Sequence, residues 1–175
     1  HDAAKEHYWL ISDSGMAVYQ TKDKQLYYRG NNPLRIPLFE EKHLDQISDF
    51  KIDKKGNYWI SYWKFKPVEK GLTILQYDPI AGTTLFEQSY PPALGSPYMD
   101  VNQLMISHNG TLWAAGINSL LNYNAESKQL IQHKKPDPKE YEINARNILH
   151  VHEDYENNLW VSTDNGLYVT TPEEE

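Results

Sequence analysis

Residues 153–168 read EDYENNLWVSTDNGLY, and this stretch carries the signals that decide the fold. Asp154 stands six residues before Trp160, where a carboxylate can accept hydrogen bonds from its own backbone at the start of a turn. Asn157 stands three residues before Trp160, and asparagine tolerates a left-handed backbone. A second turn ends at Gly166. The stretch therefore predicts a strand, a tight hairpin, a strand with Trp160, another turn and a third strand.

The same pattern occurs around three earlier tryptophans. From Trp9 through Trp59 and Trp113 to the fourth tryptophan, the spacings are 50, 54 and 47 residues. The position six residues before the tryptophan holds Asp53, Ser107 and Asp154 in the last three copies, and the position three before it holds Gly56, Gly110 and Asn157. A repeat of this length is typical of one four-stranded blade of a β-propeller.

Each copy continues beyond its second turn. A third strand is expected to end at Tyr19, Tyr77 or Tyr123, and a fourth strand opens seven or eight residues later with Leu26, Leu85 or Leu130. We therefore predict an all-β fold: a single propeller segment over 1–175 with about four antiparallel four-stranded blades. The expected blades are 1–30, 46–90, 101–134 and 145–170. The first and last are expected to be incomplete, because the first begins at the turn before its tryptophan and the last stops after its third strand.

The recurring aromatic residues are interpreted as core. A lone blade cannot bury both of its faces, and a large flat side chain on the second strand can fill the gap between neighbouring sheets. We therefore expect a structural role, in preference to ligand stacking, for seven residues: Trp9, Trp59, Trp113, Trp160, Tyr19, Tyr77 and Tyr123.

Composition excludes several classes of function. The net charge is −7, and Lys and Arg form no stripe, so a nucleic-acid partner is not expected. The chain contains no cysteine, which excludes disulfides, thiolate zinc sites and a cysteine nucleophile. No apolar run reaches the length of a membrane span. Because the chain starts at His1 and not at methionine, we expect a processed chain or an excised fragment.

Segment 53–61, DKKGNYWIS, and segment 153–168 resemble two-component regulator propeller repeats. These repeats form the periplasmic sensor part of hybrid two-component systems in gut anaerobes that degrade polysaccharides. The resemblance covers nearly the whole chain. It implies a periplasmic location, further propeller blades in the parent chain, a membrane helix, a cytoplasmic histidine kinase and an oligosaccharide ligand. The chain departs from the family in its short length and in the third repeat, which has Ser107 in place of Asp.

Loops indicate where a ligand would bind. In a propeller, the loops between strands two and three and the linkers between blades emerge on one face, and the long segments 30–46, 63–70, 89–100 and 133–144 all belong to these two classes. Sugar recognition needs aromatic platforms together with charged or amide groups. The candidate ligand-binding residues are Arg35, Trp63, Lys64, Phe65, Lys66, Tyr98, Asp100, Lys134 and Asp164. Trp63 is the first choice because it lies outside the repeat register; the alternative is that Trp63 and Phe65 merely anchor the insertion.

Metal binding and catalysis have little support in the sequence. His150 and His152 face the same way on a strand, but no third ligand is indicated, so we predict no metal, no cofactor and a position lining the propeller channel. No catalytic motif is present, and no catalytic residue is predicted.

The sequence thus favours a sensor segment in which a bound oligosaccharide shifts how propellers pack in a dimer. Two alternatives stay open, a propeller lyase or glycosidase-like enzyme and a protein-interaction scaffold. Exposed strand edges also make association with a second copy an expectation.

Overall fold

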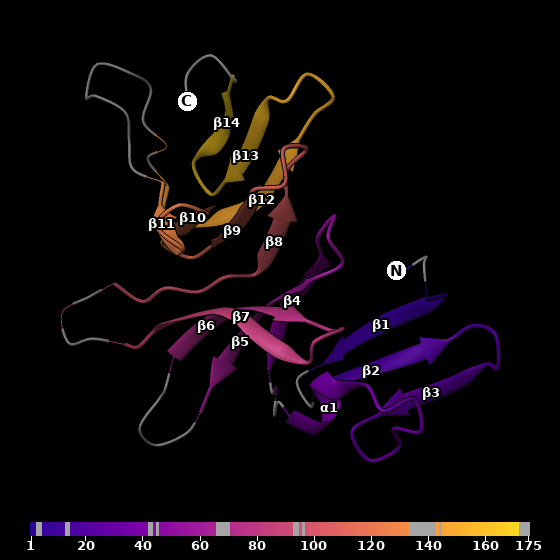
Figure 1. The fold of residues 1–175 in the computed structure, drawn as a ribbon. Coiled ribbons are helices and arrows are strands. Elements are labelled where there is room, and N and C mark those ends of the chain that lie inside the picture. The colour runs from indigo at the N-terminus through magenta and orange to yellow at the C-terminus, as the bar shows by residue number, and fades with distance from the viewer. Residues whose placement is uncertain are drawn as a thin grey trace. The chain divides into compact units, whose positions relative to one another are not determined.

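The computed structural model describes residues 1–2, 5–12, 15–41, 44, 46–65, 71–92, 95, 97–133, 143 and 145–171. The chain divides into two compact units, His1–Ser89 and Tyr90–Glu175. Each unit contains two antiparallel sheets whose neighbouring strands are consecutive in the chain (Figure 1). Among the described residues the helix α1 is short, and no helix is long and apolar enough to cross a membrane.

The first unit begins with a three-stranded sheet of β1 (His7–Ser12), β2 (Gly15–Gln20) and β3 (Gln25–Tyr28). After α1 (Pro37–Glu41) comes a four-stranded sheet of β4 (Ile47–Ile52), β5 (Tyr58–Lys64), β6 (Gly71–Asp78) and β7 (Thr83–Tyr90). The second unit contains a four-stranded sheet of β8 (Gln103–Ile106), β9 (Leu112–Gly116), β10 (Ser119–Asn124) and β11 (Gln129–Gln132). Its other sheet has three strands, β12 (Ile148–Glu153), β13 (Leu159–Thr163) and β14 (Gly166–Thr170).

Four antiparallel sheets with incomplete first and last members confirm the predicted fold class. The predicted hairpin turns are also confirmed. The backbone N–H groups of Lys55 and Asn57 both donate to Asp53 Oδ1 at 2.9 Å, and Gly56 has a φ of 85°. Asp154 accepts the equivalent pair of bonds, and Asn157 takes the left-handed conformation with a φ of 65°. A local carboxylate and a residue that tolerates positive φ therefore fix these hairpins.

Neighbouring sheets within each unit pack through their tryptophans. In the first unit, the Trp9 ring lies 5.0 Å from the Phe50 ring and 5.1 Å from the Tyr58 ring of the next sheet, measured between centroids. In the second unit, buried Trp113 clusters with Leu159 and Val161 of the next sheet. In both pairs the tryptophan is covered by the residues just before and just after the next tryptophan, because side chains alternate along a strand.

The seven expected core aromatics are not equally buried. Trp59, Trp113 and Tyr77 are buried, whereas Trp9, Tyr19 and Tyr123 are half-buried. Trp160 departs from the expectation, because its side chain is 37% exposed. It lies on the face of β13 that points away from Trp113, and the strand register places Val169 and Leu167 beside it on that face. Both of these neighbours are exposed as well.

The segment between the first two sheets is more ordered than a loop. Helix α1 falls within residues 30–46 and buries Leu38 and Phe39, which are 1% and 4% exposed. Phe39 packs edge-on against Trp9 at 5.9 Å between ring centroids. The first tryptophan is therefore covered partly by a helix, in a segment that the sequence predicted to be a long loop on the ligand-binding face.

Candidate functional site

The second unit brings three of the predicted ligand residues, Tyr98, Asp100 and Asp164, into one row of connected segments. The Asn118 side chain, in the turn between β9 and β10, donates from Nδ2 to the Tyr98 carbonyl at 2.6 Å. The Asp100 backbone N–H donates to the Ile117 carbonyl at 3.0 Å. The linker into β8 is thereby attached to the turn between strands two and three of its own sheet.

The row continues into the last sheet. The Asn118 backbone N–H donates to the Arg146 carbonyl at 2.7 Å, and Ile117 and Asn147 form an isolated antiparallel bridge. The Asp164 N–H donates to the Asn147 carbonyl at 3.0 Å, and the Asn147 N–H donates back to Asp164 Oδ1 at 3.2 Å. We call the row of Tyr98, Asp100, Asn118, Arg146, Asn147 and Asp164 the polar rim. It lies at the ends of the strands opposite the tight turns at 107–111 and 154–158, on the side that the topology assigned to ligand binding.

The polar rim combines an open aromatic ring with hydrogen-bonding groups. Tyr98 is 52% exposed, and its hydroxyl donates to Asp100 Oδ2 at 3.0 Å. Burial of the hydroxyl raises the Tyr98 pKa, and the bond to Asp100 and the negative charge of Asp100 raise it further, so the phenol stays protonated at neutral pH. Arg146 and Asp164 are exposed residues of the same row. An exposed aromatic ring in a row that also holds exposed polar residues is suited to a polyhydroxylated ligand.

Three rim residues were not predicted from the sequence: Asn118, Arg146 and Asn147. Asn118 takes the left-handed conformation, with a φ of 52°, and the next residue, Ser119, stands where other repeats have Gly15 and Gly166. Asn147 Oδ1 is buried and has no hydrogen-bond partner in the described part of the chain. A buried acceptor of this kind is uncommon. The only sequence signal for these residues was that the polar turn 118–119 replaces glycine in the third repeat.

The first unit holds three other candidates, Trp63, Lys64 and Phe65, at the end of β5. The half-buried Trp63 ring stacks on the Phe65 ring at 6.5 Å between centroids with an interplanar angle of 30°, and Phe65 is 55% exposed. Lys64 Nζ forms an ion pair with the Glu87 carboxylate on β7. This ion pair links the second strand of the sheet to the fourth, so we assign Lys64 a structural role.

The remaining ligand candidates do not join these groups. Arg35 is exposed in a turn before α1, where its N–H donates to the Asn32 carbonyl at 3.0 Å and its φ is 50°. Lys66 and Lys134 lie outside the described residues.

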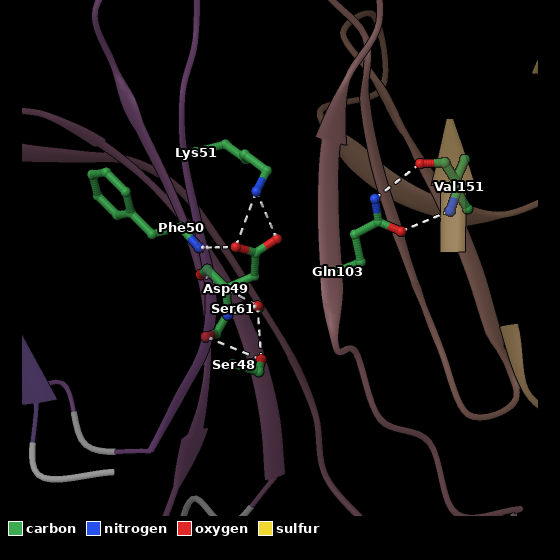
Figure 2. A network of polar contacts seen from close by, with 7 residues as sticks. All are labelled: Ser48, Asp49, Phe50, Lys51, Ser61, Gln103 and Val151. Carbon is green, nitrogen blue, oxygen red and sulfur yellow. Dashed lines mark hydrogen bonds and ion pairs between the residues drawn. The ribbon is translucent and has the colours of Figure 1, made fainter. Parts of the chain in front are cut away.

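The sequence did not predict a polar network on β4 and β5, which Figure 2 shows. Register shifts between Ile47 and Asp49, so that Ser48 forms a β-bulge. The fully buried Ser61 hydroxyl accepts from the Asp49 N–H at 3.1 Å and lies 2.8 Å from the Ser48 hydroxyl. Lys51 forms an ion pair with Asp49 at 3.0 Å. The network satisfies the backbone at the bulge, so we assign it a structural role.

A second polar contact in Figure 2 joins the two sheets of the second unit. The Gln103 side chain on β8 donates from Nε2 to the Val151 carbonyl at 2.9 Å, and its Oε1 accepts from the Val151 N–H at 2.7 Å. We call this the Gln103 clasp. It uses a side-chain amide to pair with a strand as another backbone would, and so holds β12 against β8.

The two histidines singled out from the sequence are exposed on β12. His150 pairs with Ser162 and His152 with Trp160, so both share the exposed face of the last sheet. Among the described residues, no group of three or more His, Cys, Asp or Glu side chains is arranged to hold a metal ion.

Comparison with known proteins identifies the architecture. The chain is similar over 99% of its length to the extracellular domain of BT3049 from B. thetaiotaomicron, a protein named as a hybrid two-component system, with 14% identity and a TM-score of 0.64. It is also similar over 96% of its length to the WD40 β-propeller domain of Doa1, with 14% identity and a TM-score of 0.61. The chain has a β-propeller fold.

Each sheet is thus a propeller blade, and this chain spans only part of the propeller proteins it resembles. It covers 22% of the BT3049 chain and 47% of the Doa1 chain. PorZ of Porphyromonas gingivalis, named as a surface component of the type-IX secretion system, is similar at 16% identity with a TM-score of 0.53, and 24% of it is covered. No protein-family model and no curated protein matches the sequence.

Proposed function

We propose that this propeller segment is the ligand-sensing, extracytoplasmic part of a hybrid two-component regulator, and that it detects an oligosaccharide for a histidine kinase elsewhere in the protein. The observation that carries the proposal is the fold similarity to the BT3049 extracellular domain over 99% of the chain. The four repeats that resemble regulator propeller repeats in sequence support the same role. A periplasmic location follows from the proposal.

The polar rim is the proposed contact surface for the sugar. The exposed Tyr98 ring can stack on the apolar face of a pyranose, which is how aromatic residues give affinity without using a charge. The side chains of Asp164 and Arg146 can accept from and donate to hydroxyl groups beside that ring. The bond from Tyr98 to Asp100 fixes the direction of the phenol before a ligand arrives.

The rim also supplies a route by which binding changes blade packing. The Asn118 N–H to Arg146 carbonyl bond and the Ile117–Asn147 bridge connect the third blade to the fourth. A ligand that contacts Tyr98 and Asp164 together would favour one relative placement of these two blades. Such a bias is a shift between pre-existing conformations, and its size equals the difference in ligand affinity between them.

We infer that the segment binds its ligand without transforming it. The Asp100 carboxylate is engaged through both oxygens, one with the Tyr98 hydroxyl and the other with the Val101 N–H. Asp164 Oδ1 accepts from a backbone N–H as well. Carboxylates whose oxygens already accept hydrogen bonds from the protein are suited to orienting neighbouring groups. Proton transfer to or from a ligand needs a carboxylate oxygen directed at that ligand.

Binding is tested with a panel of neutral and acidic oligosaccharides, by thermal shift and by calorimetry. At least one glycan is expected to stabilise the protein, and Tyr98→Ala should weaken its affinity about tenfold, or about 1.4 kcal/mol. The matched control is Tyr155→Ala, which removes a tyrosine that is 88% exposed in the turn at the other end of β13. Equal losses in both variants would contradict a role for the rim.

Two further outcomes would count against the sensor proposal. One is the absence of stabilisation by every glycan tested on the protein that contains the whole propeller. The other is a full-length protein with neither a membrane helix nor a kinase module. Turnover of a glycan by the segment would instead favour the alternative in which the propeller is an enzyme.

A further inference from the structure

The backbone N–H groups of the polar rim already donate within the protein where the linker meets the third blade. The Asp100 N–H donates to the Ile117 carbonyl at 3.0 Å, and the Asn118 N–H donates to the Arg146 carbonyl at 2.7 Å. The Val101 N–H, next along the chain, donates to Asp100 Oδ1 at 2.8 Å. Backbone N–H groups directed at the ligand are a common way in which proteins bind carboxylate, sulfate and phosphate groups. These three N–H groups are therefore not available to an anionic ligand.

The same holds where the rim continues into the last blade. The Asp164 N–H donates to the Asn147 carbonyl at 3.0 Å, and the Asn147 N–H donates to Asp164 Oδ1 at 3.2 Å. An acidic sugar would therefore have to be recognised by a cationic side chain. Of the six residues that define the polar rim, Arg146 is the one cation, against the two carboxylates of Asp100 and Asp164, so the rim has a net charge of −1.

The aromatic ring of the rim has one of these carboxylates at its edge. Asp100 Oδ2 accepts a hydrogen bond from the Tyr98 hydroxyl at 3.0 Å. A sugar stacked on the exposed Tyr98 ring would therefore lie close to a negative charge. That charge repels a uronate or a sulfate. A carboxylate oxygen can accept more than one hydrogen bond, so Asp100 can still accept from the hydroxyl groups of a neutral sugar.

We propose that the polar rim selects neutral oligosaccharides and discriminates against uronic acids and sulfated sugars. The inference rests on the proposed function, because it names the class of ligand for the same surface. The rim offers acceptors for hydroxyl groups, while the backbone donors that an acidic group needs are used by the protein itself. Selectivity then comes from disfavouring the wrong ligand as well as from contacts with the right one.

Matched pairs of glycans provide the test, with the protein that contains the whole propeller. Each neutral malto-, cello-, manno- or galacto-oligosaccharide that binds in calorimetry is compared with the same glycan oxidised at C6 to the uronic acid. Galacturonan, alginate and chondroitin fragments are measured beside them. The oxidised form is expected to bind at least about tenfold more weakly than the neutral form. This difference should shrink between about 0.05 and about 0.5 M salt, because salt screens the repulsion, whereas the affinity of the neutral form should change little.

Two variants connect the discrimination to the rim. Asp164→Asn and Asp100→Asn each remove one negative charge and keep an oxygen that can accept from the backbone N–H. Each should narrow the ratio of neutral to oxidised affinity by about threefold or more, whatever its effect on the neutral ligand alone. The matched control is Glu156→Gln, which removes an exposed carboxylate in the turn at the other end of β13 and should keep the wild-type ratio. Circular dichroism checks that all three variants fold.

The possible outcomes separate this inference from the sensor proposal. An oxidised or sulfated glycan that binds as tightly as its neutral form would overturn the inference and leave the sensor proposal standing. A narrowed ratio in Glu156→Gln equal to that in Asp164→Asn would also overturn it, since the discrimination would then come from the net charge of the whole protein. Absence of binding by every glycan, neutral and acidic, would overturn both proposals together.

Discussion

Trp113 and Trp160 occupy the same position in adjacent blades, yet one is buried and the other is 37% exposed. The sheet that follows Trp113 covers it, whereas the indole N–H of Trp160 donates to Asp154 Oδ2 at 2.7 Å. The repeat therefore specifies the position of the indole on its own sheet. Whether that indole is buried depends on the sheet that comes next.

The largest effect is expected from removing each indole in turn. Trp113→Ala should lower the free energy of unfolding by about 3–5 kcal/mol, because it leaves a cavity between two sheets. Trp160→Ala should cost only about 1 kcal/mol, since it removes a half-exposed ring and one hydrogen bond. Urea denaturation measures both values. Equal losses would show that position within the repeat matters more than coverage.

A smaller effect is expected at the Gln103 clasp, which holds the fourth blade over Trp113. Gln103→Ala leaves the N–H and carbonyl of Val151 without these bonds and should cost about 1–3 kcal/mol. The control is Gln129→Ala, an exposed glutamine on β11 of the same blade, which should change stability by less than about 0.5 kcal/mol. If Gln103→Ala behaved like this control, the amide would not be a link between the blades.

The smallest effect is a loss of stability at low pH, which involves the hydrogen bond from the Trp160 indole to Asp154. Hydrogen bonds to the Asp154 carboxylate lower its pKa from 3.8 to about 2. The bond from the Trp160 indole has the larger effect and the bond from the Asn158 side chain the next. A lowered folded-state pKa stabilises the fold above the unfolded value, and this contribution is lost as the pH falls from about 4 towards 2. The destabilising effect of Asp154→Asn on the melting temperature should therefore shrink over that window.

The indole N–H resonance of Trp160 gives a direct measurement. Its chemical shift should titrate with an apparent pKa near 2, while that of Trp113 should not respond, because the corresponding turn uses Ser107. A Trp160 resonance that titrated near 4 would mean that the hydrogen bond does not form in solution.

Much of the fold could be predicted because its signals are local. The Asp53 and Asp154 turns and the tryptophan register depend on residues within six positions of each other, so a single sequence contains all the information. The exposure of Trp160 could not be predicted in the same way, because it depends on a neighbouring sheet. Helix α1 was missed because only five residues form it, and its position follows from burying Leu38 and Phe39.

The candidate site was predictable only at the level of topology. The structure connects the predicted residues Tyr98, Asp100 and Asp164 in one row. Their role in binding stays a prediction. Asn118 and Asn147 could not be found from the sequence, because their place in the row comes from backbone bonds between segments that lie far apart along the chain. The ion pair between Lys64 and Glu87 could not be predicted either, because the two residues lie on different strands, 23 positions apart.

The Gln103 clasp has a consequence for how such arrays can be rearranged. The position four residues before the turn residue holds Asp49 in the second blade, Gln103 in the third and His150 in the fourth. Of these three side chains, only the amide carries its donor and its acceptor on one carbon, which lets Gln103 pair with both the carbonyl and the N–H of a single residue, Val151. Because Gln103 contacts only backbone groups of Val151, the clasp does not depend on which side chain that position carries. An engineer who shuffles repeats could therefore keep this glutamine as a connector and vary the module after it.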